Sequence, residues 1–441
     1  MLKTPEIIHP SPGNQSRRSD TVSAVFNLIA TVVGGGTLSL PYAFSQASVA
    51  KVAFGPTGGY ATTLILLCMT LFVLLAYMIL VRDIWSGLIG LLVGWFTENE
   101  AGEVIFTPEE SNWVLVGCLI ATLPACLAKS LHALRHMCYV GFFSALVLTV
   151  AIGYRCFEYN TEHPEARKQA VAFTSNASQI LGAFPIMSLA FMCQFNILSV
   201  HASLVNPTRE RLKGIIHSSL GAGGSIYLAL GFLGYFYAYG NTQDDILLNF
   251  APSDKVVVWG RLGLGITMLV AIPMLLLPCR DAFEELASQL YEVVTAKFSA
   301  RKTTPLISGN GASSSRGNYS SLNGELGATG SFDTSSMDAN VAAALRRVMK
   351  AARHFMTTVG LMIFCLFFAV SIPGVALVWS ICGSSVGFFV SFGLPALFYL
   401  KIRAKKAFNI RKLAAWVMLI VTCFASVLCT YNAIATAASK Q

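Results

Sequence analysis

The chain has 441 residues, of which 54% are hydrophobic and only 12% are charged. Soluble globular domains carry roughly 25% charged residues, so this composition excludes a soluble domain with a single anchor and indicates an all-α polytopic membrane protein. The formal net charge of +9 does not predict a nucleic-acid partner, because the basic residues cluster beside apolar segments, as the positive-inside tendency of membrane proteins expects.

The first apolar segment, 22–46, follows a polar tail and is interrupted in its middle. The tail, 1–21, lacks the basic, apolar and small-residue order of a cleaved signal peptide. Three consecutive glycines, Gly34–Gly36, interrupt the apolar run, and Pro41 follows. Because glycine is a poor helix former and proline removes a backbone donor, we expect a broken helix. Broken helices at membrane depth line cavities and build the substrate sites of secondary transporters.

Further apolar segments of about 20 residues mark candidate spans. They lie at 58–82, 111–129, 136–156, 177–201, 214–239, 255–279, 356–380, 381–402 and 413–436. The stretch Ile84–Phe96 is too short to cross, and either extends the span before it or lies re-entrant. We therefore expect a first bundle over 22–298 that ends in an interfacial helix (Asp281–Phe298), the last three helices over 356–436, and a tail at 437–441.

Residues 299–355 separate the two groups of spans and are predicted to be a largely disordered cytosolic loop. From 303 to 340 the sequence is rich in Ser, Gly, Asn and Thr, which is typical of disorder. Lys and Arg concentrate in segments that we place in the cytosol: 129–135, 209–213, 297–353 and 401–412. The alternating segments fall on the opposite side: 98–110, 155–168 and 243–254.

This alternation conflicts with the charge of the N-terminus. Counted back from the third span, the first span would start outside the cytosol and carry Lys3, Arg17 and Arg18 with it. One missing crossing between the first two spans would restore a cytosolic N-terminus.

Five motifs with a common resemblance occur in order along the chain. They are FNLIATVVGGGTLSLPYAFSQA from Phe26, MCQFNILSVH at Met192–His201, NPTRERL at Asn206–Leu212, DILLNF at Asp245–Phe250 and PMLLLPCR at Pro273–Arg280. Together they resemble the amino acid/auxin permease family, in particular its branch of sodium-coupled neutral amino acid transporters and vacuolar amino acid transporters. The resemblance implies eleven helices, with two inverted five-helix repeats in a LeuT-type bundle and one more helix.

The chain departs from that family in two places. The segment AFGPTGG at Ala53–Gly59 is similar to the start of the family's third helix, but here it follows the first helix almost directly, so the second helix is absent and about 10 spans remain. An incomplete gene model or a skipped exon is the expected reason, and a real ten-span protein is the alternative. Sodium-coupled members also carry an asparagine at Ala30 and a hydroxyl near Leu269 and Ala271, so the sodium site loses side chains and proton coupling is favoured.

The predicted substrate site combines the first and sixth helices. Its candidate residues are Asn27, Thr31, Gly34, Gly35, Gly36, Gln194 and Asn196. The glycines would offer backbone N–H groups to a substrate carboxylate, with close helix packing as the alternative. Asn27 and Thr31 share a helix face and either line the path or bond between helices. Gln194 and Asn196, with Ser188 upstream, are intramembrane polar groups, which usually face the bundle interior.

The coupling candidates are His201 and Thr267. Histidine changes charge between about pH 5 and 8, although a lone histidine near a helix end is more often structural. Thr267 is polar but does not stand at the family's sodium-ligand position. The apolar spans as divided above hold no Asp or Glu at mid-depth, so coupling by a carboxylate is not expected. The eleven cysteines form no C-x-x-C pair, which predicts neither a metal site nor a disulfide framework, and no cofactor is expected.

These features predict a secondary active transporter of amino acids, small neutral ones by the resemblance, coupled to H⁺ or, less favoured, Na⁺. The alternatives are a transporter-like sensor without flux and a non-functional product that lacks the second helix. No H-E-x-x-H, paired intramembrane aspartates or nucleophile elbow occurs, so no enzyme is expected. We expect a multi-pass protein of the plasma membrane or of the vacuolar or lysosomal membrane.

Overall fold

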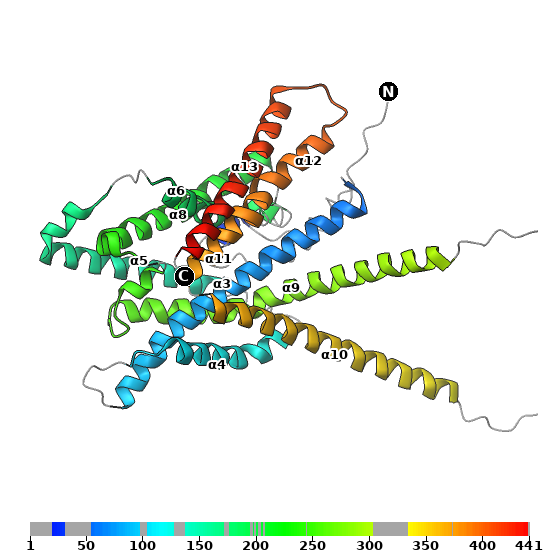
Figure 1. The fold of residues 1–441 in the computed structure, drawn as a ribbon, viewed down its shortest axis with the longest axis horizontal. Helices are drawn as coiled ribbons and strands as arrows, with labels where there is room; N and C mark the ends of the chain where they lie inside the picture. The colour runs from blue at the N-terminus through cyan, green and yellow to red at the C-terminus, as the bar shows by residue number, and fades with distance from the viewer. Residues whose placement is uncertain are drawn as a thin grey trace, which may run out of the picture.

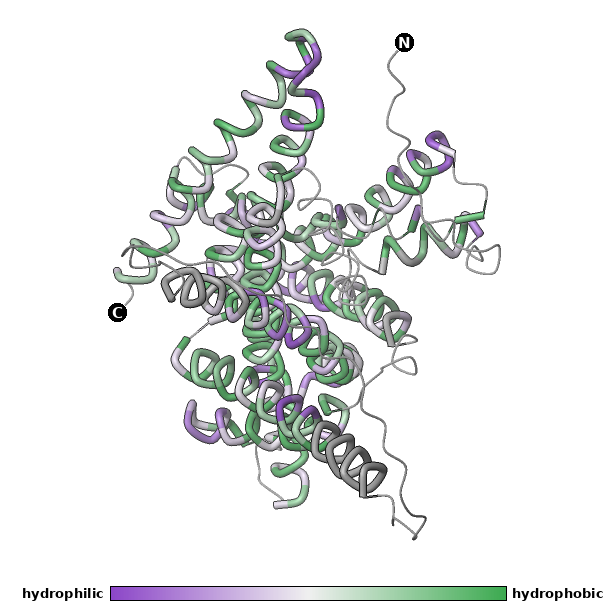
Figure 2. Tube along the Cα trace, turned by 90° about the vertical axis from the view of Figure 1, so that its right-hand side faces the viewer, coloured by the Kyte–Doolittle hydropathy of each residue, from purple (hydrophilic) through white to green (hydrophobic). Residues whose placement is uncertain are grey.

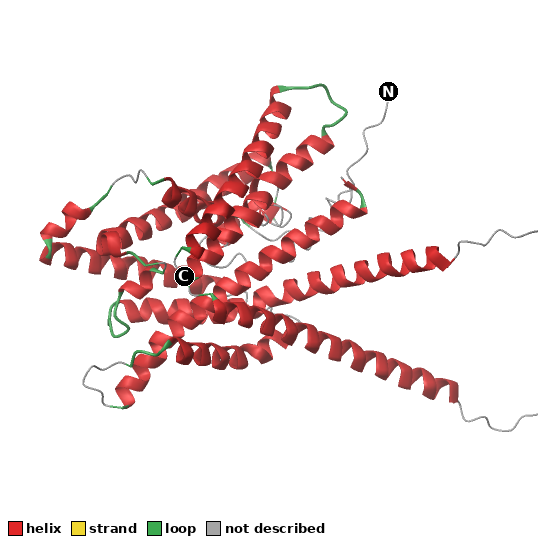
Figure 3. Ribbon diagram, viewed as in Figure 1, coloured by secondary structure: helices red, strands yellow, loops and turns green. Residues whose placement is uncertain are grey.

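The computed structural model describes residues 20–30, 54–97, 104–127, 137–171, 176–194, 197, 200–201, 204–205, 208–243, 245–302, 334–372 and 374–439. Within these residues the chain is helical and no β-strand occurs (Figure 3). Eight of the helices in the described ranges are long and apolar enough to cross a membrane. Hydrophobic residues run along them, and hydrophilic residues gather at helix ends and connections (Figure 2). The all-α polytopic architecture is therefore confirmed; the LeuT-type arrangement and the number of helices stay predictions.

The first two helices are of very different length. Helix α1 covers Thr21–Ala30, and α3 covers Pro56–Phe96 as one helix of 41 residues. Gly55 precedes it with φ of 78°, a left-handed conformation that suits glycine. The two predicted segments 58–82 and 84–96 are thus a single helix. At 1.5 Å per residue it is about 60 Å long, roughly twice the hydrocarbon thickness of a bilayer.

The middle of the chain forms α4 (Pro108–Leu127), α5 (Met137–Glu162), α6 (Ala177–Ala190) and α8 (Arg209–Ala238). Side chains cap three of these helices. Thr107 and Glu110 form a reciprocal capping box before α4, Asn176 accepts the N–H of Ser178 at α6, and Thr208 accepts the N–H of Arg211 at α8. The caps satisfy N–H groups that a helix start leaves unpaired, so these boundaries follow from local sequence.

The next two helices extend well beyond the predicted spans. Helix α9 covers Val257–Lys302, and α10 covers Thr334–Ser371. The predicted interfacial helix Asp281–Phe298 continues the span before it without interruption. Both helices also reach into the stretch 299–355 that was predicted to be a loop; of the part predicted to be disordered, 303–333 lies outside the described residues. In Figure 1 the two helices leave the bundle on the same side and diverge.

The C-terminal part contains α11 (Val375–Cys382), two π-helical turns (Gly383–Gly387 and Phe389–Gly393), α12 (Leu394–Ile402) and α13 (Ile410–Ala438). The predicted division at residue 380 is wrong. Helix α10 ends at Ser371 and the chain then runs helically from Val375 to Ile402. Pro373 explains the position, because proline cannot donate the backbone hydrogen bond that a continuous helix needs.

The largest buried core joins α3 and α9 at the centre of the bundle. Leu74, Met78 and Ile79 of α3 and Ile272, Leu275 and Leu276 of α9 belong to one buried cluster, together with residues of α4, α10 and α11. Burial of such side chains stabilises by roughly 1.5–3 kcal/mol each in water, whereas in lipid the gain comes from packing. This core fixes α3 as the central helix, against which the other elements are arranged (Figure 1).

Candidate functional site

The fifth predicted span, 177–201, which carries the motif that resembles the family's sixth helix, is discontinuous. Helix α6 ends at Ala190, Phe191 forms a turn, Met192 and Cys193 are not helical, and helical backbone resumes at Gln194. We call Phe191–Cys193 the α6 break. The Met192 N–H donates to Leu189 O (3.1 Å), which tightens the last turn of α6. A helix end leaves backbone carbonyls outside the helical ladder, so this break brings polar backbone groups into an apolar bundle.

Four elements pack around the α6 break. Cys193 is buried in one cluster with Ala24 and Leu28 of α1 and with Ile215 of α8. Met192 is buried in another cluster with Leu66 and Met69 of α3 and with Val390 of the second π-helical turn. The Phe191 ring lies edge-on to Tyr227 of α8, with centroids 5.5 Å apart. The break is therefore enclosed between α1, α3, α8 and the π-helical region.

The π-helical region approaches α6 at backbone distance. A Cβ atom on Gly383 would lie 2.4 Å from the carbonyl oxygen of Pro185, so only glycine fits there. Helix α13 also holds α6: Ser178 donates to Asn432 Oδ1 (2.7 Å), and Asn432 Nδ2 donates to Ser178 O (2.9 Å). π-helical turns often occur at functional sites, and here they border the α6 break.

Several polar atoms near this region are buried without a hydrogen-bond partner in the part of the chain that the structure describes. They are Ser188 Oγ, Gln194 Oε1, His201 Nδ1, Ser380 Oγ and Ser391 Oγ. A buried polar group that makes no hydrogen bond costs about 1–3 kcal/mol. Ser188 and Gln194 flank the α6 break directly, so a polar ligand there would satisfy groups that are unsatisfied in the protein alone.

The structure describes only some of the predicted substrate residues. Gln194 begins the helical segment after the break. Asn27 lies on α1, which contacts that segment through Leu28 and Val200; the side chain of Asn27 lies outside the described residues. Thr31, Gly34, Gly35, Gly36 and Asn196 are also outside them. The first and fifth predicted spans are thus adjacent, and the binding roles of these residues stay predictions.

The two predicted coupling residues have different surroundings. His201 is half-buried and belongs to the helical segment that follows the α6 break. Thr267 of α9 is buried, and its hydroxyl donates to Gly263 O one turn earlier (2.7 Å). That bond uses the only proton of the hydroxyl, so Thr267 keeps acceptor capacity alone. Their roles in coupling stay predictions.

The spans as divided from the sequence hold no Asp or Glu, but the longer helix α3 includes one; the absence of a carboxylate at mid-depth stays a prediction. Asp83 lies inside α3, within the candidate span Thr57–Phe96. Its side chain is 15% exposed and accepts a hydrogen bond from Arg82 Nε (2.9 Å). The Trp85 indole donates to Gly265 O (3.2 Å), about 9 Å along α9 from the exposed Trp259. Asp83 is thus a largely buried carboxylate within the length of α3. The predicted second span ends at Arg82, so the pattern of apolar residues does not place Asp83 within a spanning helix.

The segment 245–254 packs on this part of α3. Ile84 and Leu88 of α3 share a buried cluster with Leu247 and Phe250. Arg261 of α9 is buried and donates to the carbonyl oxygens of Ala251 (2.9 Å), Phe250 (2.6 Å) and Leu247. These three bonds attach the carbonyl groups of a non-α-helical segment to α9; two of the carbonyls also accept backbone N–H groups, Leu247 O from Phe250 (3.2 Å) and Ala251 O from Asp254 (3.1 Å). The result is a compact charged region at one end of α3 and α9.

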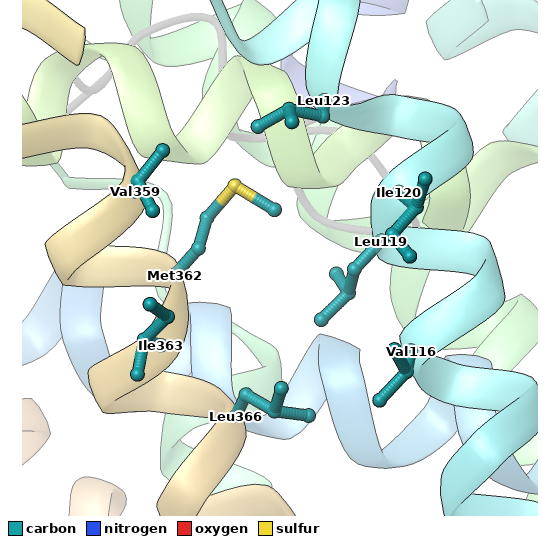
Figure 4. Close-up of a pocket in the computed structure, with 8 residues that line it drawn as sticks. All are labelled: Val116, Leu119, Ile120, Leu123, Val359, Met362, Ile363 and Leu366. Atoms are coloured by element: carbon teal, nitrogen blue, oxygen red, sulfur yellow. The ribbon is translucent and has the colours of Figure 1, made fainter. Parts of the chain in front are cut away.

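A separate groove between α4 and α10 is entirely apolar. It has a volume of about 140 Å³ and is lined by Val116, Leu119, Ile120, Leu123, Val359, Met362, Ile363 and Leu366 (Figure 4). No polar atom of the lining faces it. An amino acid carries two charged groups that need polar partners, so this groove does not fit such a ligand and is not the substrate site.

A comparison with known families agrees with this architecture. The family described as "Transmembrane amino acid transporter protein" matches residues 47–437. This match begins directly after the first predicted span and includes the α6 break, α3, α9 and the π-helical region.

Several named transport proteins are similar to parts of this chain, at 22–34% identity. The chain is 25% identical over 301 residues to "Putative sodium-coupled neutral amino acid transporter 11" of Mus musculus, covering 58% of this chain and 63% of that protein. It is 22% identical over 309 residues to "Vacuolar amino acid transporter 7" of Saccharomyces cerevisiae, covering 60% and 59%. A shorter match, 34% identical over 102 residues, is to "Solute carrier family 38 member 10" of Mus musculus, covering 23% and 9%.

The chain thus spans about three fifths of the length of the first of these relatives. The family match covers most of the chain and falls on a multi-pass helical bundle, and the family is one of membrane transporters rather than enzymes. The protein therefore belongs to the transmembrane amino acid transporter family.

Proposed function

We propose that the protein is a secondary active transporter of small neutral amino acids that works by alternating access, with a proton as the coupling ion. One observation carries this proposal: the predicted span 177–201 is broken at Phe191–Cys193, against α1, and the unpartnered Ser188 Oγ and Gln194 Oε1 atoms flank the break. Discontinuous helices with free backbone groups bind substrates near the bilayer midplane in secondary transporters.

The amino acid class follows from the relatives and from the chemistry of the break. Two relatives are named as amino acid transporters. A zwitterionic substrate needs donors for its carboxylate and acceptors for its ammonium group. Backbone N–H groups at Gly34–Gly36 would supply the donors, and the Gln194 amide oxygen would supply one acceptor. The unpartnered polar atoms that flank the break belong to the uncharged side chains Ser188 and Gln194, which favours a neutral side chain on the substrate.

The coupling ion is the less direct part of the proposal. The mouse relative is named as sodium-coupled, yet Ala30, Leu269 and Ala271 provide no side-chain oxygen where the resemblance expects ligands for Na⁺. Thr267 donates its hydroxyl proton to Gly263 O; its oxygen keeps acceptor capacity, but it does not stand at the expected ligand position. Proton coupling requires only one titratable group, and His201 is the titratable residue among the predicted coupling candidates.

The absent second helix bears on whether this chain transports by itself. The family match starts at residue 47, after the first predicted span, as it would if the alignment were interrupted between the first and third helices. We propose that a version with a family second helix inserted between the first span and Ala53 transports, and that the 441-residue chain does not. A helix lost from an inverted repeat removes one crossing and reverses the orientation of the first span relative to the rest.

Uptake of a radiolabelled neutral amino acid into proteoliposomes tests these statements. The 441-residue chain and the version with the inserted helix are compared at equal protein density. Robust uptake by the 441-residue chain would show that the second helix is dispensable. Substrate-dependent thermal stabilisation without uptake by either version would indicate a sensor rather than a transporter.

The same vesicles test the coupling ion. Uptake is measured under a pH gradient with sodium replaced by choline, and then with sodium and no pH gradient. We expect uptake that follows the pH gradient in choline. Transport that collapses when sodium is removed and ignores the pH gradient would contradict proton coupling while leaving amino acid transport intact.

A further inference from the structure

Two aspartates of the segment between α8 and α9 have similar backbone roles and opposite surroundings. Asp245 Oδ1 accepts the N–H of Leu247 (3.0 Å), and Asp254 Oδ1 accepts the N–H of Val256 (3.0 Å). Asp254 is also ion-paired to Arg155. In the part of the chain that the structure describes, the Oδ2 atom of Asp245 is buried and has no hydrogen-bond partner.

The charges that face Asp245 come from two helices. Asp83 of α3 opposes its ionised form, and Arg261 of α9 favours it. Arg82 is already paired to Asp83, and Arg261 donates to three backbone carbonyls of the segment. Asp244 precedes Asp245 in the sequence and lies outside the described residues. A buried carboxylate oxygen without a donor is costly as an anion and far less costly as a neutral acid.

The pKa values of the two aspartates move in opposite directions. Burial raises the pKa of Asp245, and the negative charge of Asp83 adds to this, against the lowering effects of the Leu247 N–H and Arg261. For Asp254, burial alone would raise the pKa, but the hydrogen bonds from Arg155, Val256 and Val257 outweigh it and lower the pKa. The loop therefore holds one carboxyl built to remain charged and one that tends to take a proton.

The segment that contains Asp245 packs against both central helices, α3 and α9. Leu247 and Phe250 are buried with Ile84 and Leu88 of α3 and with Val257 of α9. A Cβ atom on Gly87 of α3 would lie 3.9 Å from Pro252. Ionisation of Asp245 places a negative charge at this junction beside Asp83, and protonation removes it. The contact between the segment and α3 is therefore expected to tighten when Asp245 is neutral.

We propose that Asp245 is a reversible proton-binding site, paired electrostatically with Asp83, on the non-cytosolic side that charge alternation predicts for 243–254. Its binding step forms an O–H bond at Oδ2 with a proton from a hydronium ion, which leaves as water. That this proton is the one coupled to transport rests on the proposed function. The binding itself does not, and it is measured without transport.

Infrared difference spectroscopy of the full chain in lipid nanodiscs tests the binding directly. A protonated carboxylic acid has a carbonyl stretch that a carboxylate lacks, and its amplitude is followed by titration. We expect the wild type to show such a band at pH values above the ordinary aspartate range. Asp245→Asn should abolish it, and Asp254→Asn, the matched control in the same loop, should leave it in place.

A second variant keeps the test decisive if Asp245→Asn does not fold. Asp83→Asn removes the neighbouring negative charge, so the midpoint of the wild-type band should move to lower pH. A band that is missing in the wild type, that persists in Asp245→Asn, or whose midpoint is unchanged in Asp83→Asn would overturn the proposal. Suppression of the band by sodium chloride, with choline chloride as the control, would assign the carboxylate to Na⁺ and would also overturn it.

The link to transport is tested separately with the transporting version. Asp245→Asn should lose the dependence of uptake on external pH, whereas Asp254→Asn should retain it. If the infrared titration gives the expected result but the wild-type transporting version shows no uptake, only the proposed function is contradicted. A pH dependence that survives in Asp245→Asn would overturn the coupling role of this site.

Discussion

Arg155 of α5 holds Asp254 with two of its nitrogen atoms. Arg155 Nη2 donates to Asp254 Oδ1 (2.9 Å), and Nε lies 2.8 Å from Oδ2. The same carboxylate accepts the N–H groups of Val256 (3.0 Å) and Val257 (3.4 Å) at the first turn of α9. One side chain thus ties the end of α5 to the start of α9, and Glu158 adds a second ion pair to Arg155.

This pair predicts a loss of stability in acid. The pKa of Asp254 is lowered, so its stabilising effect is present above the ordinary aspartate pKa and is lost as the pH falls through the lowered value. Asp254→Asn should reduce the free energy of unfolding at neutral pH by about 1.5–3 kcal/mol, as expected for hydrogen bonds to a charged group. Thermal melts of purified protein between neutral and acid pH check this. Equal acid sensitivity of wild type and Asp254→Asn would show that the pair does not control it.

Substitution at Gly383 should disturb the packing of α6. A Cβ atom there would meet the Pro185 backbone at 2.4 Å from the carbonyl oxygen and 2.8 Å from the carbonyl carbon, so α6 must move. We expect Gly383→Ala to destabilise by about 1–3 kcal/mol and to reduce transport. Gly360→Ala on α10 is the matched control, because no atom lies within 4 Å of its Cβ position. It should be neutral or stabilise by up to about 1 kcal/mol; equal melting temperatures for both variants would contradict the close contact.

Removal of the Gln194 amide should abolish the response to substrate without lowering the stability of the protein. Gln194 Oε1 is buried without a partner in the described residues, so Gln194→Met should keep or slightly raise the melting temperature. The stabilisation produced by a neutral amino acid should disappear. Gln289→Met on α9 is the control, because Gln289 Oε1 is also buried and unpartnered but lies far from the α6 break along the chain. Retained substrate response in Gln194→Met would remove Gln194 from the site.

A bulky residue among the three glycines should stop transport without preventing insertion. Gly35→Leu would occupy the space in which backbone N–H groups approach a substrate and would favour a continuous helix. Uptake by the transporting version is expected to fall to background at normal expression. The same change at Gly360, which is exposed on α10, should leave uptake intact. Uptake at the wild-type rate in Gly35→Leu would refute an unwound substrate site in the first span.

Much of the architecture could be predicted from the sequence because hydrocarbon imposes it. Apolar segments of sufficient length in a chain with 12% charged residues must form spanning helices, since lipid offers no partner to backbone groups. Local signals that the pattern of apolar segments does not use mark several boundaries in the structure, such as Thr107 with Glu110 before α4 and Thr208 before α8. Pro373 in the sequence marks the break between α10 and α11, which the division of the apolar segments places at residue 380 instead.

Other features depend on neighbours that are distant in sequence, and only the tertiary structure decided them. The α6 break falls at Phe191–Cys193, where no glycine or proline stands, and contacts with α1, α3 and α8 hold it. Arg82–Asp83 looks like the end of a span, but α3 continues because Arg82 donates to Ala369 O (3.1 Å) and to Asp83. Asp245 and Asp254 are the same residue type, and each accepts the backbone N–H of the residue two positions ahead. Which of them keeps its charge is set by Arg155 and Asp83, because the energy of a buried carboxylate depends on the groups that surround it in space.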